Sequence, residues 1–183
     1  MRFAQIRSMD ISDGEGIGVA IYTQGCNQHC PQCHNPETWD LNAGEKYTNK
    51  HQKKILELMD KSYINHLSIL GGEPLLPRNL NALINLCEES KRLYPNKMIW
   101  CWTGYKWDNI TSLKLSDYKS EEDYQNLKQL LFDYIDVLVT EPFEIDKRDI
   151  TLKWRGSTNQ MVIDLKATLN QDNPLNKPIL YCE

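Results

Sequence analysis

Short β-branched and aromatic runs alternate with amphipathic stretches along most of this 183-residue chain. The runs predict strands over residues 17–23, 66–70, 98–102 and 135–139. Apolar residues at helical spacing predict helices over 48–60, over 79–93, and around the stripe Leu127, Leu130, Leu131 and Tyr134. Such strand–helix–strand repeats form parallel sheets. A closed eightfold barrel needs about 250 residues, so the sequence predicts an α/β fold, an open partial (β/α) barrel of mostly parallel strands.

The composition is that of a single folded domain. Apolar residues make up 40% of the chain and charged residues 25%, which is enough apolar surface for a core. No internal repeat or glycine-serine linker divides the chain. We therefore expect one domain over residues 1–165 and a C-terminal tail over 166–183, and the sequence leaves open whether that tail folds onto the domain.

Charge and hydropathy exclude two kinds of partner. No run approaches the ~18 apolar residues of a membrane-spanning helix, and no hydrophobic signal region follows the first seven residues. We expect a cytoplasmic protein without a membrane partner. Lysine and arginine total 21 against 25 acidic residues, a formal charge of −4. Because nucleic-acid binders usually carry a clustered basic face, we expect no nucleic-acid partner.

Three cysteines fall within eight residues, at Cys26, Cys30 and Cys33. A loop of this size presents three thiolates toward one centre. A 4Fe-4S cluster ordinarily takes four thiolates, so three would leave one iron without a protein ligand. Open coordination positions are where metal centres bind substrates. The spacing thus predicts a cluster with one reactive corner.

Other interpretations of the six cysteines remain. A structural zinc site completed by His29, His34 or a distant cysteine is one alternative, and a disulfide is another, although reducing compartments disfavour it. Cys87 lies on a helical apolar stripe and Cys101 inside a strand, so both are predicted to be buried core residues. The sequence assigns no role to Cys182.

Two further segments follow predicted strands. Gly71-Gly72-Glu73 follows the strand over 66–70, and Thr103-Gly104 follows the strand over 98–102. In open or closed α/β sheets, ligands bind at the carboxyl ends of the strands, where the cysteine loop also falls. The aromatic side chains around this second segment are predicted to pack mostly in the core: Trp100, Trp102, Tyr105 and Trp107.

The chain also resembles a known family. The cysteine loop followed by His34-Asn35-Pro36-Glu37-Thr38-Trp39-Asp40, and then Gly71-Gly72-Glu73-Pro74, is similar to the radical S-adenosylmethionine (SAM) enzymes, specifically the glycyl-radical-enzyme activases. Two more segments, residues 99–105 and 154–160, look most like the activating proteins of anaerobic ribonucleoside-triphosphate reductases. The resemblance runs from about Asp10 to Asp164.

The resemblance implies a partial barrel of the radical SAM type and a mechanism. Its cofactors would be a 4Fe-4S cluster and SAM. Reductive cleavage of SAM would give a 5'-deoxyadenosyl radical that abstracts a hydrogen from a glycine of the partner. That partner would be the large subunit of the reductase, and a low-potential flavodoxin or ferredoxin would be the electron donor. The implied cluster ligands are Cys26, Cys30 and Cys33, and the implied cofactor-binding residues are Gln32, Cys33, His34, Gly71, Gly72 and Glu73.

The resemblance leaves some segments without a single role. Residues 13–16 match a loop expected to border the partner, and a plain surface turn fits equally well. Arg155, with Ser157 and Asn159, would bind either the cofactor carboxylate or the partner. Thr140-Glu141-Pro142-Phe143 departs from the Asp-Gly usual after this strand in the family.

Two rival functions remain. The chain would be an activase of another glycyl radical enzyme, or a zinc-binding interaction module without catalysis. No acid–base constellation marks another kind of active site, since the four histidines are scattered and no carboxylate pair stands out. The metal content of the protein distinguishes these functions, because the interaction module would contain zinc and either activase would contain iron.

Overall fold

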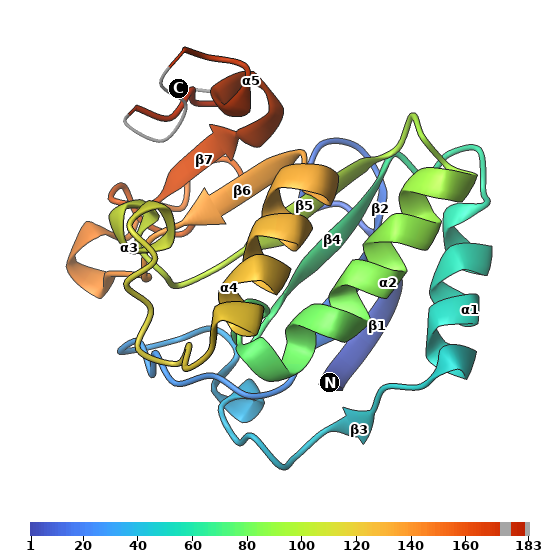
Figure 1. Cartoon of the computed structure of the whole chain (residues 1–183), viewed down its shortest axis with the longest axis horizontal. Coiled ribbons are helices and arrows are strands. Elements are labelled where there is room, and N and C mark those ends of the chain that lie inside the picture. The colour runs from blue at the N-terminus through green and yellow to red at the C-terminus, as the bar shows by residue number, and fades with distance from the viewer. Residues whose placement is uncertain (173–176, 182–183) are drawn as a thin grey trace.

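The computed structural model describes residues 1–172 and 177–181. These residues form a seven-stranded open sheet with helices packed against it, so the predicted open α/β fold is confirmed (Figure 1). The strands lie in the order β3-β1-β2-β4-β5-β6-β7. Because β3 and β7 are opposite edges, the sheet does not close on itself.

Four parallel strands form the centre of the sheet. They are β2 (Gly18–Thr23), β4 (His66–Gly71), β5 (Met98–Trp102) and β6 (Val137–Thr140). All four were predicted from β-branched and aromatic runs. Their carboxyl ends meet at one edge of the sheet, which places the loops that follow them side by side.

The connecting helices also follow their predicted periodicity. Helix α1 (Asn49–Met59) begins after Thr48, whose side chain and that of His51 form a capping box. Helix α2 spans Pro77–Leu93, and α4 (Glu121–Lys128) continues into the π-helical segment η2 (Gln129–Tyr134). Shorter helices lie in the connections: η1 (Pro36–Thr38), α3 (Trp107–Thr111) and η3 (Ile145–Lys147).

The prediction of mostly parallel strands is wrong, because the sheet is mixed. Strands β1 (Arg2–Asp10), β3 (Glu45–Lys46) and β7 (Met161–Asp164) all pair antiparallel to their neighbours. Strand β1 returns directly into β2 through a short loop, and β7 returns beside β6, so neither needs a crossover helix. Strand β1 was missed because most of its residues are not buried and show no regular alternation.

The helices cover one face of the sheet. In Figure 1, α2 and α4 lie in front of it, and α1 lies beside α2. Side chains on that face, including Ile21, Leu67, Ile69 and Ile99, are fully buried with the apolar stripes of the helices. Cys87 and Cys101 belong to the same core, as predicted. The main core therefore lies between the sheet and its helices.

Loops cover the opposite face of the central strands. Trp100 on β5 is fully buried there with Val137, Val139 and Val162. Ser68 on β4 donates a hydrogen bond to the Asp13 carbonyl. The loop over residues 11–17 thus lies across this face, between the strands and solvent.

The described part of the C-terminal region packs onto the sheet. Helix α5 (Leu165–Leu169) follows β7 directly. The Tyr181 N–H donates to the Val162 carbonyl at 2.8 Å, and the Tyr181 ring lies 5.0 Å from that of Trp100. Cys182 lies outside the described residues. Within the described ranges, no helix combines the length and apolar character needed to cross a bilayer.

Candidate functional site

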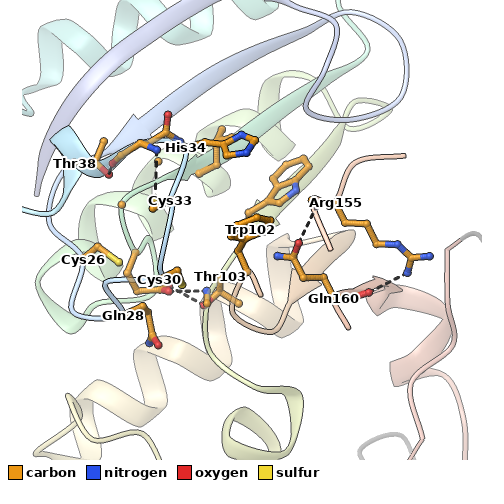
Figure 2. A pocket seen from close by; sticks show the side chains of 18 of the residues that line it. Cys26, Gln28, Cys30, Cys33, His34, Thr38, Trp102, Thr103, Arg155 and Gln160 are labelled. Carbon is orange, nitrogen blue, oxygen red and sulfur yellow. Dashed lines mark hydrogen bonds between the residues drawn. The ribbon is translucent and has the colours of Figure 1, made fainter. Parts of the chain in front are cut away.

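A cavity of about 390 Å³ lies at the carboxyl ends of the parallel strands (Figure 2). Cys26, Cys30 and Cys33 line it together with the glycine segment after β4 and with Thr103 and Gly104 after β5. The expectation that these three segments meet at one edge is confirmed. Residues after β6 and before β7 complete the far wall.

The cysteine loop is closed at its base by hydrogen bonds. The Gly25 N–H donates to the Thr38 carbonyl at 2.7 Å, and the Cys26 N–H donates to the Trp39 carbonyl at 3.2 Å. The buried Gln24 side-chain amide donates to two further carbonyls of the returning segment. Because both ends are tied together, the loop projects from the sheet as one unit.

The three loop cysteines are free thiols. Burial raises the pKa of Cys26 to about 11, although the nearby backbone N–H groups of Gln28 and His29 act to lower this pKa. Burial also raises the pKa of Cys30. The Asn35 N–H lies 3.4 Å from the Cys33 sulfur. Metal binding would therefore release protons from this loop.

The cysteine loop suits a cluster better than a single ion. No three His, Cys, Asp or Glu side chains among residues 1–172 and 177–181 lie close enough together to hold one metal ion. In a four-iron cluster each thiolate binds a different iron, so the sulfurs need not converge on one point. Three free thiols around one cavity, with the Asn35 N–H directed at one of the sulfurs, fit such a cluster.

The glycine segment runs in contact with the start of the cysteine loop. A Cβ on Gly71, whose φ is +108°, would lie 2.7 Å from the Thr23 nitrogen, and one on Gly72 would lie 2.4 Å from the Gly25 carbonyl oxygen. The Glu73 N–H donates to that same carbonyl at 2.8 Å. Only glycine permits this approach. The backbone of the glycine segment therefore lies beside Cys26.

Glu73 connects the loops after β4 and β5. Its buried carboxylate accepts hydrogen bonds from the Leu75 N–H, the Thr103 hydroxyl at 2.7 Å and the Gly104 N–H at 2.8 Å. Burial nevertheless raises the pKa of Glu73 to about 7. The carboxyl group is thus held rigidly at the cavity wall, close to the point of changing charge near neutral pH.

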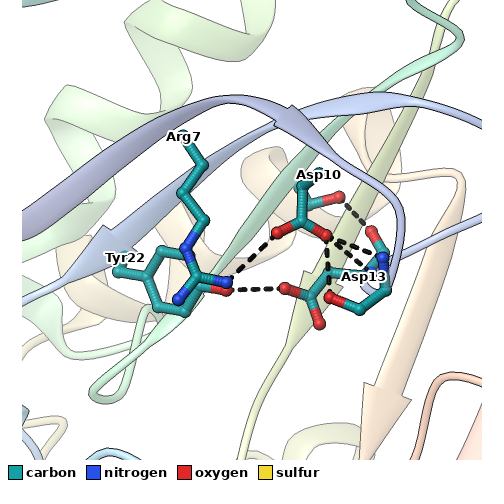
Figure 3. Close-up of polar contacts among 6 residues, drawn as sticks. Arg7, Asp10, Asp13 and Tyr22 are labelled. Atoms are coloured by element: carbon teal, nitrogen blue, oxygen red, sulfur yellow. Dashed lines mark hydrogen bonds and ion pairs between the residues drawn. The ribbon is translucent and has the colours of Figure 1, made fainter.

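The loop over residues 11–17 contributes Ser12 and Asp13 to the cavity. The Tyr22 hydroxyl donates to the Asp13 carboxylate at 2.7 Å (Figure 3), and burial raises the pKa of Asp13. Beside it, burial would raise the pKa of Asp10, but hydrogen bonds from Ser12 and Asp13 outweigh burial and lower it. This polar network fixes the loop over the sheet.

Asp117 supports the cysteine loop from outside. It accepts hydrogen bonds from the Asn27 side chain at 2.7 Å and from the Tyr105 hydroxyl at 2.5 Å. This contact was not predictable from the sequence, because Asp117 lies in a polar segment distant from every motif. Trp100, Tyr105 and Trp107 are buried as predicted, while Trp102 is partly exposed and lines the cavity.

Most of the predicted site residues lie at the cavity. The cysteines, His34, Gly71, Gly72 and Glu73 line it, whereas Gln32 is exposed and is not part of the wall. Arg155 also lines the cavity, and its guanidinium donates to the Gln160 carbonyl at 2.9 Å. Sequence reasoning missed Asp13, Trp102, Phe143 and Gln160 as members of the wall. Their only common signal is proximity to strand ends.

Comparison with known proteins identifies the family to which this chain belongs. Residues 12–163 match the family model described as a 4Fe-4S single cluster domain, and the chain belongs to this family. The matched region contains the cysteine loop and the complete parallel centre of the sheet.

Curated relatives identify one group of proteins within this family. The chain is 34% identical to an anaerobic ribonucleoside-triphosphate reductase-activating protein of Salmonella typhimurium, over 91% of this chain and 100% of the relative. The protein of the same name from Escherichia coli K12 is 32% identical with the same coverage. That from Enterobacteria phage T4 is 34% identical over 87% of this chain and 92% of its own. The chain is a member of this family of activating proteins.

Proposed function

We propose that this chain activates an anaerobic ribonucleoside-triphosphate reductase by generating a glycyl radical on its large subunit. The observation that carries the proposal is the cavity itself, in which three free thiols face the glycine segment. Three cysteine ligands would leave one iron of a 4Fe-4S cluster open, and the adjoining cavity would provide space for a small ligand. Relatives named as activating proteins of this reductase support the choice of partner.

The proposed cofactors are a 4Fe-4S cluster, held by Cys26, Cys30 and Cys33, and SAM. When both are bound, they would supply radical chemistry: one electron would cleave SAM to methionine and a 5'-deoxyadenosyl radical, which would abstract a glycine hydrogen. A low-potential flavodoxin or ferredoxin would provide the electron. The open sheet would then correspond to the partial barrel of the radical SAM type.

The protein groups have positioning roles in this proposal. Gly71 and Gly72 expose backbone beside Cys26, where the methionyl amino group would bind, and Glu73 would offset its charge. Cys33 and His34 would contact the nucleoside from the cysteine loop, and Gln32 would do so through its backbone. The cofactor carries the difficult chemistry, while the chain orients it and excludes side reactions. We propose that this occurs in the cytoplasm.

The experiment is performed on protein prepared without oxygen and reconstituted with iron and sulfide. After reduction and addition of SAM, we expect 5'-deoxyadenosine, and with the reductase large subunit a glycyl radical in the EPR spectrum. An intact cluster without 5'-deoxyadenosine would refute the enzyme proposal.

The rival functions give different results in the same experiment. 5'-Deoxyadenosine without a radical on the reductase, but with one on another glycyl radical enzyme, would identify a different activase. Stoichiometric zinc and no iron in the protein as prepared would instead favour the interaction module.

A further inference from the structure

A short segment near the C-terminus pairs with the outer edge of β7. The backbone of residues 179–181 hydrogen-bonds to that of residues 162–164 at two points, over 2.8 and 2.9 Å. The Ile179 N–H also donates to the buried Thr168 hydroxyl at 2.8 Å. This segment lies beyond residues 12–163, which match the family model. Hydrogen bonds therefore fix a part of the chain outside that region against the sheet.

The Tyr181 side chain of this segment contacts two walls of the cavity. Its hydroxyl donates to the Glu15 carboxylate at 2.7 Å, in the loop over residues 11–17. Its ring lies 5.8 Å from the Trp154 ring and 5.0 Å from the Trp100 ring, edge-on in both cases. The loop and Trp154 both line the cavity, whereas Tyr181 does not. Tyr181 thus joins two walls without entering the ligand space.

Glu15 lies at the point of the loop where the backbone has the most freedom. It is flanked by Gly14 and Gly16, whose φ angles are +127° and +87°. Glycine loses more conformational freedom on folding than any other residue. The Glu15 carbonyl oxygen lies 3.1 Å from the His66 Nδ1, which anchors the backbone from the sheet. Tyr181 holds the side chain of the same residue, so it restricts the segment whose ordering is entropically most costly.

Trp154, in the second wall, depends on its neighbours for its conformation. Its φ is +60°, in the left-handed region, although it is not a glycine. Such a residue costs on the order of 1 kcal/mol or more and persists only where its surroundings hold it. The Trp102 indole N–H donates to the Trp154 carbonyl at 2.7 Å, and the Tyr181 ring packs edge-on against the Trp154 ring. The same tyrosine therefore supports both walls.

Resting on the proposed function for the identity of the ligand, we infer that Tyr181 is a positioning residue for SAM. It holds the 11–17 loop through Glu15 and the second wall through Trp154, so both are ordered before the ligand arrives. A cavity ordered in advance binds its ligand more tightly, because less conformational entropy is lost on binding. The inference gives the C-terminal segment a role that the sequence left open.

The first test measures the order of the loop on the full chain without SAM. Tyr181→Phe removes the hydroxyl and keeps the ring, so amide hydrogen exchange over residues 11–17 should become about threefold to tenfold faster. Tyr94→Phe is the matched control, because its hydroxyl donates to the Leu56 carbonyl at 2.9 Å and Tyr94 does not line the cavity. It should leave exchange in the loop unchanged. Unchanged exchange in Tyr181→Phe would overturn the inference.

The second test measures turnover of SAM by the reconstituted protein. Tyr181→Phe should raise the KM for SAM in 5'-deoxyadenosine formation by about threefold to tenfold, with a smaller effect on kcat, because the cysteines and the glycine segment are unchanged. Glu15→Ala should raise the KM as well. The double variant should have no higher KM than the worse single variant, because both substitutions remove the same hydrogen bond. Additive effects in the double variant would contradict the role of this bond.

The outcomes separate the inference from the proposed function. Wild-type protein that has an intact cluster but forms no 5'-deoxyadenosine would refute the proposed function, and with it the choice of SAM as ligand. Normal turnover in the wild type, with the same KM in Tyr181→Phe and Tyr94→Phe as in the wild type, would refute the positioning role alone.

Discussion

Replacing Cys26, Cys30 or Cys33 by alanine should remove the iron-sulfur cluster and the formation of 5'-deoxyadenosine together. All three thiols line one cavity, and each would be the sole protein ligand of its iron. With two ligands remaining, the loop offers too few attachment points to retain four irons. We expect iron and sulfide contents near zero and no product above background.

Cys87→Ala is the matched control for these variants. Cys87 is also a free cysteine, but it is fully buried in the core beneath the helices and does not line the cavity. The substitution should cost about 1 kcal/mol of stability through the small cavity that it leaves and should leave iron content at the wild-type level. Full iron content in any of the three loop variants would contradict the ligand assignment.

Replacing Glu73 by glutamine should change how the free energy of unfolding depends on pH. Burial raises the pKa of Glu73 from an ordinary 4.5 to about 7, so the folded state binds a proton that the unfolded state has already released. Folded wild-type protein therefore loses stability as pH rises from about 4.5 to 7. The loss attributable to this one group is about 3 kcal/mol.

The measurement compares wild type and Glu73→Gln by denaturant unfolding of the metal-free proteins at several pH values. Glutamine leaves one of the three donors, such as the Gly104 N–H, without an acceptor, so the variant starts at a disadvantage at low pH. As the pH rises to 7, the free energy of unfolding of wild type should fall by about 3 kcal/mol relative to that of Glu73→Gln. The difference between the two proteins should stay constant above about pH 8. A difference independent of pH would show that Glu73 titrates normally.

The centre of the fold was predictable because local pattern and tertiary environment agree there. Strands β2, β4, β5 and β6 are almost entirely buried, so β-branched and aromatic residues mark them clearly. The outer strands carry a weaker signal, since β1 and β7 each have only two buried residues. Their antiparallel pairing depends on where the chain returns in space, which periodicity does not encode.

The candidate site was predictable where residue type alone carries the chemistry. Cysteine spacing and the paired glycines identified the loop and the segment packed against it. Asp117, Phe143 and Gln160 were not identified, because they act through contacts between segments far apart in the chain. A carboxylate in a polar loop and a single aromatic ring after a strand have no sequence signature. Their roles emerge only when the strands bring those segments to one edge.

The architecture explains how one edge of the sheet acquires so many functional groups. Parallel strands direct all their following loops to the same end, while helices cover one face and the 11–17 loop covers the other. Glu73 then ties the loop after β4 to the loop after β5. The cysteine loop is thereby held against a rigid surface from more than one side.

The central claim is that one iron of the cluster has no protein ligand and is coordinated by SAM. It is tested most directly by electron-nuclear double resonance on the reduced cluster with SAM labelled with ¹⁵N in its amino group. We predict a resolved ¹⁵N coupling that disappears when unlabelled SAM is used. A coupling from a protein nitrogen in its place, with none from bound SAM, would contradict the account.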